Sequence, residues 1–114
     1  MKNKCAIPRE VPASVVEEHL RKYDNTNDPD FLETLSAQIR KHRVWVLRNV
    51  PISRLDSGES RDLEIIQEYA SLSSQPPPII VDEDGFVIDG GHRTQAAQFL
   101  RQRNICAYIP RKRR

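Results

Sequence analysis

The sequence has few cysteines and no long apolar run, and each absence excludes a class of protein. Its two cysteines, Cys5 and Cys106, lie near opposite ends of the chain. They form no Cys-x-x-Cys pair, so neither a zinc site nor a dithiol motif is indicated, although spacing alone leaves a disulfide open. There is no apolar run of about 18 residues and no apolar signal core after Met1, so we predict no membrane segment. We expect a cytoplasmic protein with reduced thiols.

The chain also lacks a large excess of one charge. Its formal net charge is +2 over 114 residues, which predicts no strong overall attraction to nucleic acid or membranes. Basic residues do gather at the C-terminal end, where residues 111–114 read R-K-R-R. A solvated tail is the simplest interpretation of this run, and a contact with DNA is the alternative. With 38% hydrophobic and 30% charged residues, the chain fits one ordinary domain with one modest core.

Residues 1–42 are predicted to form an N-terminal helical extension. Ser14 and Glu17 have the spacing of a capping box, which predicts a helix over residues 15–23. Asp28, followed by a proline, predicts the start of a second helix. The apolar residues of this second helix recur at helical spacing and are interpreted as core: Phe31, Leu32, Leu35 and Ile39.

Residues 43–110 alternate between strand and helix patterns. Strands are predicted at 44–47, at 79–81 and 86–88 around a Glu-Asp-Gly turn, and at 105–109. Ser60 is the predicted cap of a helix with Leu63, Ile66, Tyr69 and Ala70 on its apolar face. A later helix is predicted to run to about Arg101 and to bury Ala96, Ala97, Phe99 and Leu100. The order of helices, strand, helix, hairpin, helix and strand predicts a small α+β domain.

The stretch IDGGHRTQAAQFL, residues 88–100, contains the strongest functional signal. Gly90 and Gly91 stand at a predicted strand-to-helix junction, where they permit unusual backbone angles and leave room for a ligand. The first amides of a helix lack internal acceptors and carry partial positive charge. Arg93 adds a planar donor fork and His92 a titratable donor. This combination predicts an anion site suited to phosphate groups.

Asp89 is the unexpected member of this group. A carboxylate beside bound phosphates repels them unless it assists a metal ion, caps the helix or accepts a proton from a reacting hydroxyl. A purely structural interpretation is equally compatible with the residues. In that case Asp89 is the helix cap, the glycines form a tight turn, and His92 and Arg93 are solvated first-turn side chains.

Two segments carry a resemblance to a known family. They are V-P-I-S-R-L, and P-P-P-I-I-V-D-E-D-G-F-V-I-D-G-G-H-R-T-Q-A-A. Over residues 43–110 the chain resembles the ParB/sulfiredoxin superfamily, also described as the ParB N-terminal-like or ParB-like nuclease domain. The resemblance implies a short mixed sheet packed by helices and a pocket for ATP or CTP with Mg²⁺. The residues it implies at the phosphates are Gly90, Gly91, His92, Arg93 and Thr94.

Differences at the turn separate the branches of this superfamily. Sulfiredoxins carry a reactive cysteine immediately before the His-Arg pair, and here that position is Gly91, so we exclude their chemistry. Partition-type ParB proteins carry an arginine-rich G-E-R-R run and a further DNA-binding domain. This chain ends shortly after Pro110, so we do not expect a DNA clamp as the whole protein.

The free serine kinases are the most similar branch at the turn, with D-G-H-H-R where this chain has D-G-G-H-R. Their chemistry also uses a glutamate in the loop after the first strand, and Glu59 stands in a comparable place, although an exposed loop acid is an equal interpretation. The resemblance therefore implies a Mg²⁺-dependent phosphotransferase or nucleoside triphosphatase with Asp89 and Glu59 as catalytic residues. The phosphate acceptor stays open because Gly91 replaces a histidine. A non-enzymatic nucleotide-sensing or DNA-binding module is the competing prediction.

Overall fold

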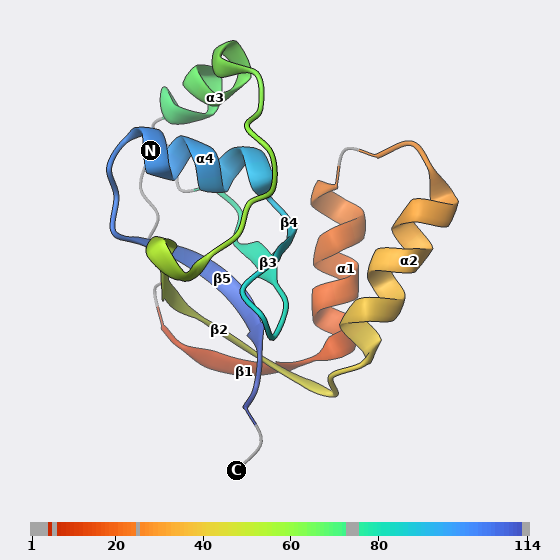
Figure 1. The fold of residues 1–114 in the computed structure, drawn as a ribbon. Coiled ribbons are helices and arrows are strands. Elements are labelled where there is room, and N and C mark those ends of the chain that lie inside the picture. Colours follow the sequence, from red (N-terminus) through yellow and green to blue (C-terminus); the bar gives the residue numbers. More distant parts are fainter. Residues whose placement is uncertain (1–4, 6, 25, 73–75, 113–114) are drawn as a thin grey trace.

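The computed structural model describes residues 5, 7–24, 26–72 and 76–112 (Figure 1). Within those residues, four α-helices and a five-stranded mixed sheet form an α+β fold, as predicted. The elements in chain order are β1 (Arg9–Pro12), α1 (Ala13–Tyr23), α2 (Pro29–Arg40), β2 (Val44–Pro51), a 3-10 turn (Ile52–Arg54), α3 (Leu63–Ala70), β3 (Ile79–Val81), β4 (Val87–Asp89), α4 (Gly91–Phe99) and β5 (Asn104–Pro110).

The strands are ordered β1-β2-β5-β3-β4 across the sheet. Neighbouring strands run antiparallel, except β3 and β5, which are parallel. The β2–β5 ladder forms the centre of the sheet and extends from the Trp45–Pro110 pair to the Pro51–Asn104 pair. The strand β4 lies at one edge and leads through Gly90 directly into α4.

Alternate strand residues enter two cores, one on each face of the sheet. On β5, Cys106 and Tyr108 belong to one cluster, whereas Ile105 and Ala107 belong to the other. Successive side chains of a strand point to opposite faces, so the clusters lie on opposite sides. The helices α1 and α2 cover the first face, and α4 covers the second (Figure 1).

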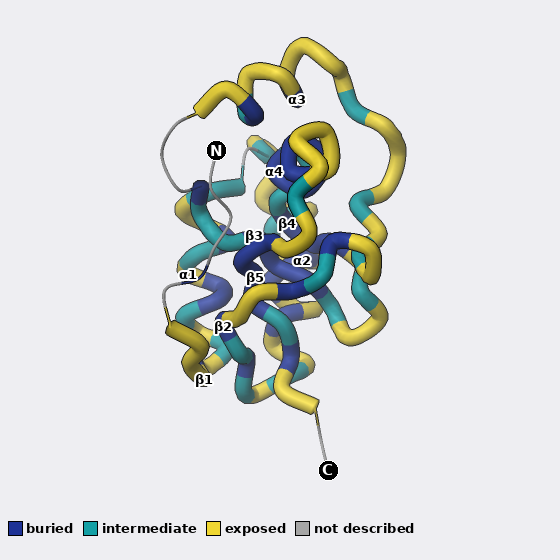
Figure 2. Tube along the Cα trace, turned by 90° about the vertical axis from the view of Figure 1, so that its left-hand side faces the viewer, coloured by how far each residue is buried: buried dark blue, intermediate teal, exposed yellow. Residues whose placement is uncertain are grey.

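The helix α3 packs on α4 and not on the sheet. Its buried residues Ile66 and Ala70 meet Ala96 of α4 in a small separate cluster. Figure 2 shows α3 as a largely exposed outer segment beyond the buried α4. Few apolar contacts therefore hold α3 and the loop before it, and this loop forms one wall of the candidate site.

The predicted helix starts are partly right. Asp28 caps α2, and its Oδ1 accepts from the N–H groups of the second and third following residues. The prediction of Ser14 as a cap is wrong, because α1 begins at Ala13 directly after the extended Pro12. Glu17 does not complete a capping box, since its carboxylate accepts from Ser36 of α2 at 2.9 Å.

Some predictions for the second half of the chain are also wrong. The cap of α3 is Asp62, which accepts from the Glu64 N–H at 2.9 Å, and not Ser60. Leu63 is exposed, so the apolar face predicted for α3 is too wide. The second strand of the hairpin is Val87–Asp89 and not 86–88.

The burial predicted for α4 is right at Ala96 and Ala97 and wrong at its end. Phe99 is 50% exposed and Leu100 is 37% exposed. The helix ends at Phe99, and its buried residues are Arg93 to Ala97. Phe99 lies beyond that buried stretch, and Leu100 is already the C-cap residue, so both side chains lie at the surface.

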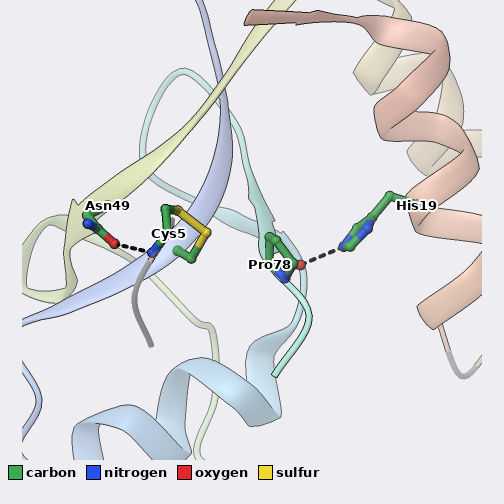
Figure 3. Close-up of a disulfide and its surroundings, with 5 residues drawn as sticks. Cys5, His19, Asn49 and Pro78 are labelled. Carbon is green, nitrogen blue, oxygen red and sulfur yellow. Dashed lines mark hydrogen bonds between the residues drawn. A yellow bond between two sulfur atoms is a disulfide. The ribbon is translucent and has the colours of Figure 1, made fainter. Parts of the chain in front are cut away.

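The expectation of reduced thiols is also wrong. Cys5 and Cys106 form a disulfide between the N-terminal segment and β5, and both are buried (Figure 3). The Cys5 N–H donates to Asn49 Oδ1 at 2.9 Å, which holds this segment against β2. The short strand β1 was not predicted, because R-E-V-P has one apolar residue and no visible alternation. Residues 1–42 therefore supply an edge strand as well as two helices.

None of the helices in the described part of the chain is long and apolar enough to cross a membrane.

Candidate functional site

The predicted strand-to-helix junction is present at the end of β4. Gly90 has φ 102°, a left-handed conformation that side chains rarely adopt, and it precedes the first turn of α4. A Cβ atom at Gly90 would also overlap the side chain of Ile79. The Thr94 N–H donates to the Gly90 carbonyl at 2.9 Å, which closes the first turn. The amides that open α4 precede this bond and lack acceptors within the helix.

The guanidinium of Arg61 lies over this opening, and no sequence motif predicts this position. A Cβ atom at Gly91 would overlap the Arg61 guanidinium, so the glycine permits the close approach. The Arg61 Nη1 donates to the Ser57 carbonyl at 2.6 Å. Gln95 of α4 accepts from the Arg61 N–H at 3.0 Å and donates to the Glu59 carbonyl at 2.8 Å. These bonds fix the loop before α3 against α4.

An open hollow of about 710 Å³ lies between this loop, α3 and α4. Its polar lining includes Ser57, Arg61 and Gln95, and its apolar lining includes Leu63 and Phe99. The loop is attached to the hairpin as well, because Asp56 exchanges backbone hydrogen bonds with Gly85 and Val87. The hollow thus runs along the second half of α4, from Gln95 to Phe99, and Arg61, which lies over Gly91, connects it to the start of this helix. It has both polar and apolar walls.

Arg93 and Asp89 face each other inside the protein. Arg93 Nη2 donates to Asp89 Oδ2 at 3.1 Å, and both side chains are less than 10% exposed. The same nitrogen approaches the Pro78 carbonyl at 3.4 Å, whereas the buried Arg93 Nε has no hydrogen-bond partner among the described residues. The predicted phosphate donor and the predicted catalytic acid are therefore paired with each other.

A second carboxyl group, that of Asp24 directly after α1, lies near enough to Asp89 to affect its ionisation. Burial raises the pKa of Asp89 to about 6, while Arg93 opposes the shift and Asp24 reinforces it. His19 of α1 donates its Nε2–H to the Pro78 carbonyl at 2.7 Å, because a carbonyl can only accept (Figure 3). Polar groups in and after α1 thus lie beside the start of β3 and the end of β4.

His92 is placed at the opening by an aromatic contact. Its ring stacks on Tyr69 of α3 with centroids 5.7 Å apart and planes inclined by 9°. Burial lowers the pKa of His92, and the neighbouring Arg61 lowers it further. The neutral ring is therefore favoured near neutral pH, and it can still donate a hydrogen bond.

The remaining predicted site residues are not all brought together. Thr94 is buried, and its hydroxyl donates back to the Gly90 carbonyl at 2.9 Å. Glu59 is exposed in the loop, and its described contacts involve its carbonyl oxygen. Gly90, Gly91 and His92 surround the opening of α4, whereas Asp89 and Arg93 lie on its inner side. No sequence pattern identified Arg61, Gln95 or Asp24.

Among the described residues, no three His, Cys, Asp or Glu side chains are grouped to hold a metal ion. No protein-family model, curated protein or solved structure matches this chain in comparisons with known proteins.

Proposed function

We propose that the chain binds a nucleoside triphosphate, ATP or CTP, through phosphate groups at the start of α4. The resemblance to the ParB/sulfiredoxin superfamily implies such a site, and one observation supports it most. The Arg61 guanidinium lies over Gly91, beside amides that carry the partial positive charge of the helix. A fixed cation and amide donors at one opening are suited to a phosphate group.

The hollow beside Arg61 supports a ligand larger than phosphate. Its volume of about 710 Å³ is within the usual range for small-molecule sites, which is about 300–1,000 Å³. The apolar side chains of Leu63 and Phe99 offer contacts for a base, while Ser57 and Gln95 offer polar groups. Exposed apolar residues at the rim would lose contact with water when a base is bound.

The donor set fits the phosphates better than it fits a metal ion held by the protein. Asp89 is already paired with Arg93, and Glu59 is exposed in the loop before α3. The described residues contain no metal-binding group of three acidic, histidine or cysteine side chains. Mg²⁺ would therefore arrive with the triphosphate and be held mainly by phosphate oxygens and water.

Calorimetric titration with ATP, CTP, ADP and GTP, each with and without Mg²⁺, tests the proposal. Arg61→Ala is expected to weaken binding about tenfold or more, because a charge-assisted hydrogen bond contributes roughly 1.5–3 kcal/mol. Arg103→Ala is the matched control, since Arg103 is exposed in the turn before β5. Equal affinity of the Arg61 variant and the control would contradict the assignment, and no binding by wild type would refute the function.

Phosphoryl transfer or hydrolysis is the second candidate, and the ionisation of Asp89 favours it. A carboxyl group with a pKa of about 6 can accept a proton near neutral pH, as a general base must. Turnover is tested by release of nucleoside diphosphate, alone and with small hydroxyl acceptors such as serine. If Asp89 is the base, Asp89→Asn should reduce turnover by roughly 10²-fold or more while binding persists. If wild type releases no nucleoside diphosphate, the chain is a nucleotide-binding module without turnover.

Compartment and further partners remain predictions. The Cys5–Cys106 disulfide is of a kind that persists in oxidising compartments and is rare in the cytosol. Thiol alkylation of the protein in freshly lysed cells therefore tests the cytoplasmic location. DNA binding through the C-terminal tail has less support than nucleotide binding, because Arg111 already pairs with Glu10 at 3.3 Å. Residues 113–114 of the tail lie outside the described residues.

A further inference from the structure

In the described part of the chain, three hydrogen bonds join the loop before α3 to α4, and all of them end on the side-chain amide of Gln95. The amide oxygen accepts from the Arg61 N–H at 3.0 Å. The amide nitrogen donates to the Glu59 carbonyl at 2.8 Å and to Ser57 Oγ at 3.2 Å. Gln95 is buried, whereas Glu59 is exposed. One buried side chain of α4 thus sets the position of an exposed loop.

The same bonds determine where the Arg61 guanidinium lies. Its Nη1 donates to the Ser57 carbonyl at 2.6 Å. Gln95 therefore holds both the backbone N–H of Arg61 and the residue whose carbonyl anchors the guanidinium. The Nη2 atom faces the start of α4, since a Cβ atom at Gly91 would overlap it. Among the described residues, Arg61 Nη2 and Nε donate to no acceptor, so they are left for a ligand.

This position of the guanidinium is electrostatically unfavourable unless an anion is bound. The start of a helix carries partial positive charge, so it attracts anions and repels a cation. Arg61 has a long, flexible side chain that would otherwise turn away from Gly91 into solvent. The bonds from Gln95 and the Ser57 carbonyl oppose this repulsion. The cation is then already in place when a phosphate arrives, and binding avoids the cost of ordering it.

We propose that Gln95 is a positioning residue of the phosphate site, which holds the Arg61 guanidinium over the start of α4 before a ligand binds. This inference rests on the proposed function and names the residue that prepares its site. Gln95 acts through Arg61 and not by contact with the phosphates. Its effect on affinity therefore requires that Arg61 is present.

A double-mutant cycle tests this dependence. Calorimetric titration with ATP and Mg²⁺ compares wild type, Gln95→Met, Arg61→Ala and the double variant. Methionine is about as long as glutamine but has no amide, so Gln95→Met removes all three bonds to the loop. Gln38→Met is the matched control, because Gln38 is exposed on α2, which covers the opposite face of the sheet. Urea denaturation of each protein shows that the fold is retained.

We expect Gln95→Met to weaken ATP binding about fivefold, the usual factor when one flexible side chain must be ordered on binding. In the Arg61→Ala background the same substitution should weaken binding by no more than about twofold. Gln38→Met should leave the affinity unchanged. A general disturbance of α4 would instead weaken binding by the same factor in both backgrounds, and that result would overturn the positioning role.

Unchanged affinity of Gln95→Met would also overturn this role and leave the proposed function standing. No binding heat with wild type would overturn both. If Gln95→Met does not fold by circular dichroism, Gln95→Leu replaces it in both backgrounds, since leucine also lacks the amide.

Discussion

Arg93 Nη2 lies 3.1 Å from Asp89 Oδ2, four residues earlier in the chain, and both side chains are buried. Residues at this spacing are neighbours on a helix, and here the pair links the end of β4 to the first turn of α4. Arg93, which was predicted to bind a ligand, thus neutralises the buried carboxylate of Asp89. The cation that lies over the opening of α4 is Arg61.

Loss of Arg93 should therefore destabilise the fold. Arg93→Ala leaves the Asp89 carboxylate buried without its partner, and breaking such a pair costs about 3–5 kcal/mol. Urea denaturation at pH 7 measures the free energy of unfolding. The exposed Arg103→Ala should change it by no more than about 0.5 kcal/mol. An Arg93 variant as stable as this control would contradict a structural role for the pair.

The sequence predicted contacts between residues close in the chain better than contacts between distant ones. The glycine turn, the cap at Asp28 and the burial of Ala96 and Ala97 follow from local patterns, and all are present. The effect of Asp24 on Asp89 joins residues that are distant in the chain, and no periodicity identifies it. The position of Arg61 depends on how the loop before α3 folds back, which its composition does not determine.

The raised pKa of Asp89 predicts a pH dependence of stability. Its folded-state pKa is about 6 against an ordinary 3.8, so the folded protein binds this proton more tightly than the unfolded chain does. The stabilisation is fully present below about pH 4 and is lost as the pH rises through 6. The rise of the pKa from 3.8 to about 6 corresponds to about 3 kcal/mol of unfolding free energy.

Asp24→Asn isolates this contribution from that of other carboxyl groups. The variant lacks the negative charge that helps to raise the pKa of Asp89, so this pKa should fall and less stability is lost as the pH rises. In urea denaturation from pH 4 to 7, the unfolding free energy of the variant should rise relative to that of wild type. The rise should be about 1.4 kcal/mol for each unit by which the substitution lowers the pKa of Asp89. A difference that stays constant across this range would show that Asp24 does not control the ionisation of Asp89.

The different burial of Leu100 and Ile80 predicts different losses of stability when each side chain is truncated to alanine. Leu100 is 37% exposed, whereas Ile80 is buried between β3 and the α1–α2 layer. Ile80→Ala should cost about 2–5 kcal/mol, and Leu100→Ala no more than about 1 kcal/mol. Paired thermal melts compare them. Equal losses at the two positions would mean that Leu100 is covered in solution, for example by a second copy of the chain.

The disulfide between Cys5 and Cys106 should provide most of the stabilisation that holds the N-terminal segment against the sheet. Cys5 and Cys106 are 101 residues apart, and cross-linking a loop of this length restricts the unfolded chain strongly. The double variant Cys5→Ala, Cys106→Ala should therefore lose about 2–5 kcal/mol of unfolding free energy. Urea denaturation with and without a reducing agent provides the control. Wild type should lose a similar amount on reduction, whereas the double variant should not respond. Wild type that is fully reduced by thiol titration and yet unfolds at the same urea concentration would contradict this account.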